Sequence, residues 1–141
     1  MNVLPDLQSS ILCDDVRQER SGKFIYIGIF DVVSAPRFPV RHPRLFVVNR
    51  WCSGEGEFTQ KTRILAPDEE SAIVEGKEIP FKLPNPHATV TNVEVFFNVL
   101  LQSQGTYWVE ILLNGDLKLR YPVQVRKVEA QTPKSPPGQP A

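Results

Sequence analysis

Three carboxylates lie within six residues near the start of the chain, at Asp14, Asp15 and Glu19. Carboxylate oxygens are the ligands that calcium prefers, and loops of some β-sandwiches supply them. Basic residues such as Arg17 are interleaved with these acids, and the spacing differs from the Asp-x-Asp-x-Asp-Gly pattern of a calcium loop. The segment is therefore predicted to be ion-paired or solvated, with a cation site or a partner-docking patch as the alternatives.

A second charged segment, residues 34–51, contains no acid and carries Arg37, Arg41, Arg44 and Arg50, whereas residues 68–78 carry five acids and one lysine. Arginines beside aromatic rings can stack on single-stranded nucleic acid. The whole chain holds 16 basic and 16 acidic residues, so no overall field draws it to nucleic acid or to an anionic membrane. We predict neither partner. Complementary contacts between two copies, or with another protein, stay open.

The sequence contains no recognisable motif for catalysis or for metal binding. The chain has two cysteines, Cys13 and Cys52, and two histidines, His42 and His87, with no C-x-x-C or H-x-x-H pair. It also lacks the G-x-S-x-G and G-K-[ST] motifs. We therefore predict a protein that is not an enzyme and needs no cofactor. Because the start of the chain does not look like a secretory signal, we expect a cytoplasmic protein with free thiols, a disulfide being the alternative.

The elements that must position these residues are predicted to be strands. Proline is frequent, with 13 residues among 141, and no window shows the 3.6-residue period of a helix. The predicted strands are residues 8–13, 23–33, 44–51, 57–65, 79–83, 89–101, 106–113 and 117–126, with a possible short strand at 71–74. We therefore expect one all-β domain, residues 1–128, with seven to eight strands in two sheets, followed by a proline-rich disordered tail, residues 129–141.

The last two strands form the clearest predicted hairpin, with a turn at Asn114-Gly115. A strict two-residue turn would place Lys118 opposite Ile111 and mix the two faces. A three-residue loop or a β-bulge that sets Leu113 opposite Leu117 is therefore expected. Pro122 lacks an amide donor, so the final strand should be a sheet edge there or carry an interruption.

Several strands are apolar on both faces, although a sandwich strand normally buries only one. If Ile25, Ile27 and Ile29 fill the core, other large side chains remain on the outer faces. These interface candidates are Tyr26, Phe30, Phe96, Leu100, Trp108 and Leu112. An exposed apolar patch of this kind usually marks an interface. The alternative is that residues 67–86 or the N-terminal arm cover these side chains.

Two local patterns resemble known families. Gly105-Thr106-Tyr107 resembles the tyrosine corner of immunoglobulin-like domains, which implies an immunoglobulin-like antiparallel sandwich. Cys13-Asp14-Asp15-Val16-Arg17, together with Ile27-Gly28-Ile29-Phe30 and Phe38-Pro39, resembles the N-terminal signature of a family of uncharacterised bacterial proteins. That resemblance implies a bacterial protein of a single domain and supplies no catalytic residue.

The function expected from these patterns is therefore binding, either to a second copy or to another protein, through an apolar outer sheet face. A small-molecule or carbohydrate-binding module is the alternative. It would require Trp51, Trp108 or Tyr26 to line a concave groove.

Overall fold

The computed structural model describes residues 2–129, which contain β-strands and no α-helix. The strands are β1 (Asp6–Gln18), β2 (Phe24–Ile29), β3 (Val32–Ala35), β4 (Val40–Cys52), β5 (Gly56–Leu65), β6 (Ala72–Glu75), β7 (Ile79–Leu83), β8 (Thr89–Leu101), β9 (Gly105–Leu113) and β10 (Asp116–Lys127). No helix long and apolar enough to cross a membrane occurs in this range. Apart from Glu129, the predicted tail lies outside the described residues.

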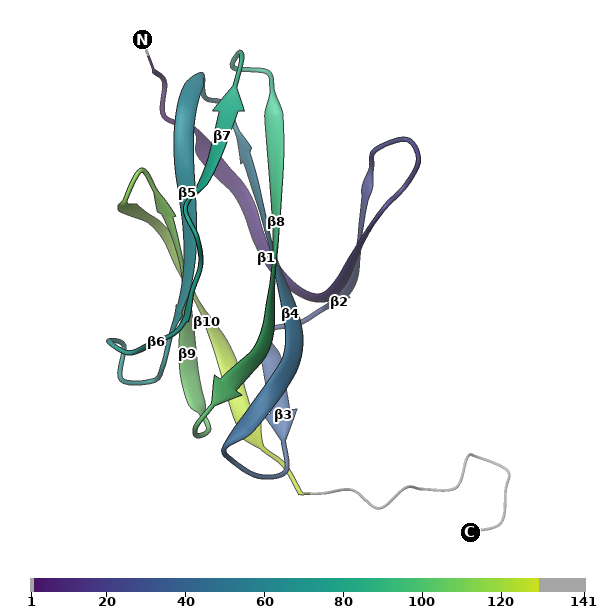
Figure 1. Ribbon diagram of the computed structural model, residues 1–141, viewed down its shortest axis with the longest axis vertical. Helices are drawn as coiled ribbons and strands as arrows, with labels where there is room; N and C mark the ends of the chain where they lie inside the picture. The colour runs from purple at the N-terminus through teal and green to yellow at the C-terminus, as the bar shows by residue number, and fades with distance from the viewer. Residues whose placement is uncertain (1, 130–141) are drawn as a thin grey trace.

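The strands form two sheets, which confirms the all-β, two-sheet prediction (Figure 1). One sheet has the order β2-β1-β4-β8. The other has the order β3-β10-β9-β5-β6, and β7 also pairs with β5. The strand count is ten rather than seven to eight, and the pair β3–β10 is parallel rather than antiparallel.

One additional strand, β6, falls on the possible short strand at 71–74, and another, β3, arises where one long strand was predicted over residues 23–33. The chain leaves β2 after Ile29, places Phe30 against the core, and enters the other sheet as β3. The carbonyl oxygen of Asp31 accepts a hydrogen bond of 3.0 Å from the amide of Gln124 in β10. This segment therefore links the two sheets instead of lengthening one of them.

The β9–β10 hairpin confirms the predicted bulge and corrects the predicted register. Asn114 and Gly115 both have positive φ, at 51° and 86°, as a two-residue hairpin turn requires. Leu113 pairs with Asp116 rather than with Leu117. A bulge between Leu117 and Leu119 then sets Leu119, and not Lys118, opposite Ile111, so that the apolar alternation is kept. Pro122 lies outside the stretch that β3 pairs, Gln124–Lys127.

The core lies between the two sheets and is built around Trp51, whose side chain is fully buried and stacks on Phe81 with ring centroids 5.4 Å apart. At the other end of the core, the hydroxyl of buried Tyr107 donates a hydrogen bond of 2.7 Å to the carbonyl oxygen of Ser103. This bond, reaching four residues back along the chain, is the one that a tyrosine corner makes. It fixes the β8–β9 connection to the core.

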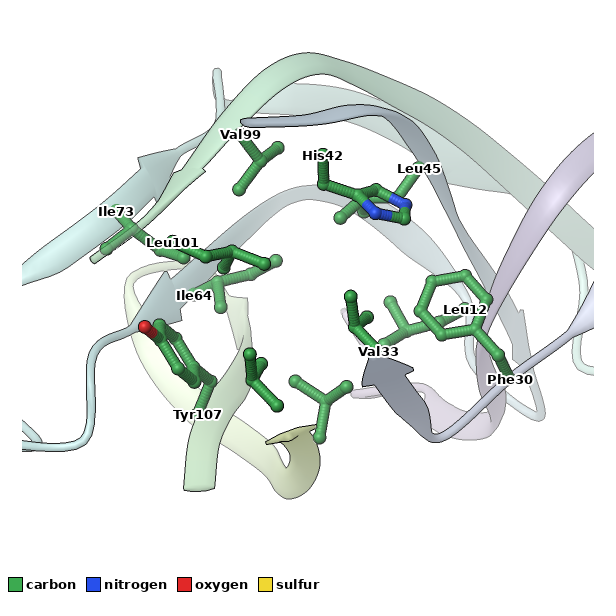
Figure 2. A pocket seen from close by; sticks show the side chains of 12 residues that line it. Leu12, Phe30, Val33, His42, Leu45, Ile64, Ile73, Val99, Leu101 and Tyr107 are labelled. Atoms are coloured by element: carbon green, nitrogen blue, oxygen red, sulfur yellow. The ribbon is translucent and has the colours of Figure 1, made fainter. Parts of the chain in front are cut away.

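An apolar cavity of about 20 Å³ lies between the sheets near this end. Figure 2 shows the side chains of Phe30 and His42 among those that line it, and their ring centroids lie 5.9 Å apart. The space would hold roughly one water molecule, too little for an organic ligand. The cavity is therefore a packing defect of the core and not a binding site.

Candidate functional site

The six interface candidates do not gather on one outer face. Leu112 is buried, and the other five are partly buried. Phe30 and Phe96 pack against the core, and Gly76 of the 67–86 connection lies beside the Phe96 ring. Leu100 borders a surface hollow formed with residues 66–73 of the same connection. The prediction that these residues form one exposed patch is therefore wrong. The connection at residues 67–86 covers part of β8.

The face of β2 that contacts solvent is the opposite of the predicted one. Phe24 and Tyr26 are partly buried and alternate with Ile25 and Ile27, so the aromatic residues lie on one side of the strand and the isoleucines on the other. Ile29 is 63% exposed, and Ile25 and Ile27 are also exposed. These three isoleucines do not fill the core.

A second apolar set is exposed along the edge strand β8. Val93, Val95 and Phe97 alternate outward, and Phe97 is 65% exposed. Asn98 has a positive φ of 51°, which interrupts the alternation. After it, Val99 and Leu101 turn inward to the core. The outer face of the four-stranded sheet therefore carries large apolar side chains on both of its edge strands, β2 and β8.

Cross-strand pairing joins these two sets into rows on one face. Ile29 lies opposite Cys13, Cys13 opposite Phe46, and Phe46 opposite Val95. Residues directly opposite in antiparallel strands point to the same face. We name the six exposed members the outer apolar face: Ile25, Ile27, Ile29, Val93, Val95 and Phe97.

The predicted charged segment runs through the middle of this face. Asp15 lies opposite Ile27 and forms ion pairs with Arg17, at 3.1 Å, and with Arg44, at 3.9 Å. The hydrogen bond from Arg17 is the main cause that lowers the pKa of Asp15, and Arg44 contributes in the same direction. Arg44 also lies 5.6 Å above the ring centre of Phe46. Both signs of charge are thus already paired within the apolar rows.

The remaining charged candidates lie apart from this pair. Asp14 packs over Gly28, where a Cβ atom would lie 2.3 Å from its carboxylate oxygen. Glu19 accepts a hydrogen bond from the hydroxyl of Ser21 in the β1–β2 turn. Arg41 donates to the carbonyl oxygen of Asn98, and Arg37 is exposed in the β3–β4 loop. The described residues hold no group of three metal-ligating side chains.

Both cysteines are free thiols, and Cys13 is buried beneath the outer apolar face. Burial is the main cause that raises the pKa of the Cys13 thiol. A raised pKa keeps a thiol protonated and unreactive at neutral pH. In residues 2–129, neither histidine side chain makes a hydrogen bond to a thiol, a hydroxyl or a carboxylate. Among the described residues, neither histidine is therefore paired with a nucleophile.

Ion-paired side chains cover part of the outer face of the six-stranded sheet. Glu110 is buried there and accepts a hydrogen bond of 2.6 Å from Arg63. Arg120 bonds to Glu69 and lies 4.4 Å above the ring centre of Trp108. The predicted interface residue Trp108 is thus already covered by a side chain of its own sheet. This face offers less uncovered apolar surface than that of the four-stranded sheet.

Sequence reasoning missed a network of buried polar side chains between the sheets. The side-chain oxygen of Gln60 accepts hydrogen bonds from the indole of Trp51, at 2.7 Å, and from Asn92, at 3.0 Å. Gln60 in turn donates to Glu94, as does Thr62, at 2.7 Å. Burial raises the pKa of Glu94, and these two hydrogen bonds offset part of that rise. The network ties β4, β5 and β8 together across the core.

A signal for this network exists in the sequence. Gln60 and Thr62 share the parity of Phe58 and Ile64 in β5, which are core residues. Asn49 likewise alternates with Val47 and Trp51 in β4, and its amide lies 3.4 Å from the Thr62 hydroxyl. Polar residues at inward positions of two strands indicate a shared buried network.

The chain is similar in part to solved structures that share little sequence identity with it. Similar solved structures include a Pseudomonas fluorescens alkylpurine DNA glycosylase AlkC bound to DNA, at 13% identity and a TM-score of 0.43, with 68% of this chain and 28% of that chain covered. Another is a beta-D-glucoside glucohydrolase from Trichoderma reesei, at 8% identity and a TM-score of 0.49, with 88% of this chain and 19% of that chain covered. The chain thus spans under a third of either protein. No curated protein matches the sequence significantly.

The sequence also matches a protein family over most of its length. A model of DUF6941, a family of unknown function, matches residues 8–126. The matched range begins in β1 and ends in β10, so it includes every strand of both sheets at least in part. The chain belongs to the DUF6941 family.

Proposed function

We propose that this protein is a non-catalytic binding module that associates with a second copy of itself through the outer apolar face. The observation that carries the proposal is the exposure of six large apolar side chains in cross-strand rows on one sheet. Isolated exposed apolar residues are ordinary on a protein surface, but several on one sheet face are typical of an interaction site.

The size of the face supports a dimer. Six side chains of this kind, each more than a third exposed, present on the order of 500 Å² of apolar surface. A stable interface buries roughly 800 Å² on each partner. Half-buried Phe46, which lies in a row between Cys13 and Val95, and charged residues such as Arg17 supply additional area. Arginine is among the residues that are enriched at interfaces.

The charge distribution supports a second copy as the partner. A two-fold contact sets the same patch against itself, so an unbalanced charge would be repelled by its own image. Here Asp15 is paired with Arg17 and Arg44, which leaves one positive charge on the patch, and the whole chain has a formal net charge of zero. The whole molecule therefore does not oppose its own association.

Two finer features belong to the same proposal. The Tyr107–Ser103 hydrogen bond supports an immunoglobulin-like relationship for the sandwich, whose ten strands and parallel pair would then be elaborations. The free thiols of Cys13 and Cys52 support a reducing compartment such as the cytoplasm.

Analytical ultracentrifugation across a dilution series tests the association. We expect the weight-average mass to rise from 16.0 kDa in dilute solution toward twice that value as concentration increases. Apolar association weakens little with salt, so the same curve is expected at low and at high ionic strength. A constant mass of one chain up to about 1 mM, which corresponds to only about 4 kcal/mol of binding energy, would exclude the dimer.

A further inference from the structure

An open hollow of about 580 Å³ lies between the β1–β2 hairpin and one end of the strands β4 and β8. In Figure 1 this hairpin stands out from the sandwich beside β8. Seven residues line the hollow: Gly22, Lys23, Phe24, Tyr26, Arg50, Thr89 and Thr91. Ligand sites in proteins occupy about 300–1,000 Å³. The hollow is therefore large enough for a small organic molecule.

Arg50 lies at one wall of the hollow, and two hydrogen bonds fix the orientation of its side chain. Its Nε donates a hydrogen bond of 3.2 Å to the side-chain oxygen of Gln8, and its Nη1 donates one of 2.8 Å to the hydroxyl of Thr91. A guanidinium has five N–H donors in a rigid plane, so others are left for a ligand. Because the side chain is already oriented, an oxyanion that binds it pays little ordering entropy.

The opposite wall adds a second positive charge. Lys23 lies in the hairpin turn, and none of the seven lining residues is acidic. The turn is fixed by its own hydrogen bonds: Gln18 donates to the carbonyl oxygen of Gly22, at 3.1 Å, and the Glu19 amide to that of Lys23, at 2.8 Å. Gly22 has a φ of +93°, which other residues rarely adopt. Two cations without a carboxylate favour a doubly charged anion.

Two aromatic side chains complete the lining. Phe24 and Tyr26 are both partly buried and belong to the hairpin. Aromatic rings bind planar ligands by stacking, and a tyrosine hydroxyl adds a polar contact. In the part of the chain that the structure describes, the Tyr26 hydroxyl has no hydrogen-bond partner. Of the three aromatic residues proposed for a groove, Tyr26 lines one, while Trp51 is buried and Trp108 lies under Arg120.

We infer that this hollow binds a small phosphate monoester carried on a planar ring, with the phosphate at Arg50 and Lys23 and the ring against Phe24 and Tyr26. A phosphate monoester carries nearly two negative charges at neutral pH, which matches the two cations. Arginine binds a phosphate through two parallel hydrogen bonds. This inference uses residues other than the six of the outer apolar face, and Arg50 and Thr91 lie next to that face on the same side of the four-stranded sheet.

Isothermal titration calorimetry with phenyl phosphate tests the inference. We expect saturable binding that is at least about tenfold tighter than that of inorganic phosphate, which lacks the ring, or of benzoate, which carries one charge. Absence of saturable binding up to about 10 mM phenyl phosphate would overturn the inference. Equal binding of inorganic phosphate would overturn the role of the ring, and equal binding of benzoate would overturn the choice of phosphate.

Matched variants locate the binding. Arg50→Gln and Tyr26→Leu should each weaken phenyl phosphate binding by about tenfold, while Arg37→Gln, in an exposed loop outside the hollow, should leave it unchanged. If Arg50→Gln fails to fold, Lys23→Gln at the hairpin turn replaces it, with an expected loss of about threefold or more. Binding that survives in the folded Arg50 and Lys23 variants would show that the anion sits elsewhere and would contradict the inference.

Discussion

Replacement of Phe97 by glutamate is expected to leave the protein a monomer at concentrations where the wild type is a dimer. Phe97 is 65% exposed, so the substitution removes little buried surface from the single chain. In a two-fold dimer, the new carboxylates would be buried in an apolar contact and near each other, which is costly. We expect the dissociation constant to rise at least about 100-fold, or about 2.7 kcal/mol, in sedimentation velocity.

Leu117→Glu is the matched control for this prediction. Leu117 is 53% exposed, but it lies beside the β9–β10 turn, outside the outer apolar face. This variant should dimerise as the wild type does, and both variants should keep the thermal unfolding midpoint of the wild type within a few degrees. Equal weakening by both substitutions would point to a general charge effect, and no weakening by Phe97→Glu would place the contact elsewhere.

Replacement of Gln60 by leucine is expected to cause the largest loss of stability. Gln60 is fully buried and makes hydrogen bonds with Trp51, Asn92 and Glu94. Leucine fills a similar volume but leaves the indole N–H and the Asn92 amide without their acceptor. Each buried group left unpaired costs about 1–3 kcal/mol, so we expect a loss of about 3–5 kcal/mol in the free energy of unfolding. Urea denaturation measures it.

Gln124→Leu provides the comparison within the same protein. Gln124 is only partly buried, and its side chain accepts one hydrogen bond, from the hydroxyl of Thr106 at 3.2 Å. Its loss should cost about 1 kcal/mol or less. If the two substitutions had equal effects on the urea midpoint, the buried network would contribute nothing beyond an ordinary surface hydrogen bond.

Local patterns in the sequence predicted the strands well. The β9–β10 hairpin was predictable because Asn114-Gly115 favours positive φ at both positions and because apolar alternation required a bulge. The position of the bulge could not be predicted, because Leu117 and Leu119 are both apolar and either could continue the alternation. The division of residues 23–33 into β2 and β3 depends on pairing with β10, far along the chain, which no local pattern contains.

The sequence predicted an exposed apolar sheet face, but it did not predict which residues form it. β2 is apolar on both faces, so its alternation does not say which face is buried; that depends on how the hairpin lies against β4 and β8. In β8, Asn98 reverses the alternation, so Phe97 and Val99 point in opposite directions although their spacing suggests one face. The hollow at Arg50 unites three segments that are distant in sequence, and it appears only in three dimensions.

Hydroxyl-radical footprinting at low and high protein concentration tests the central claim most directly, because it measures the solvent exposure of individual side chains. If the outer apolar face joins two copies, oxidation of Phe97 and Ile29 should fall several-fold as concentration rises, while oxidation of exposed Leu117 stays constant. Unchanged oxidation of Phe97 and Ile29 in samples whose mass has doubled would contradict the account, because the contact would then lie on another surface.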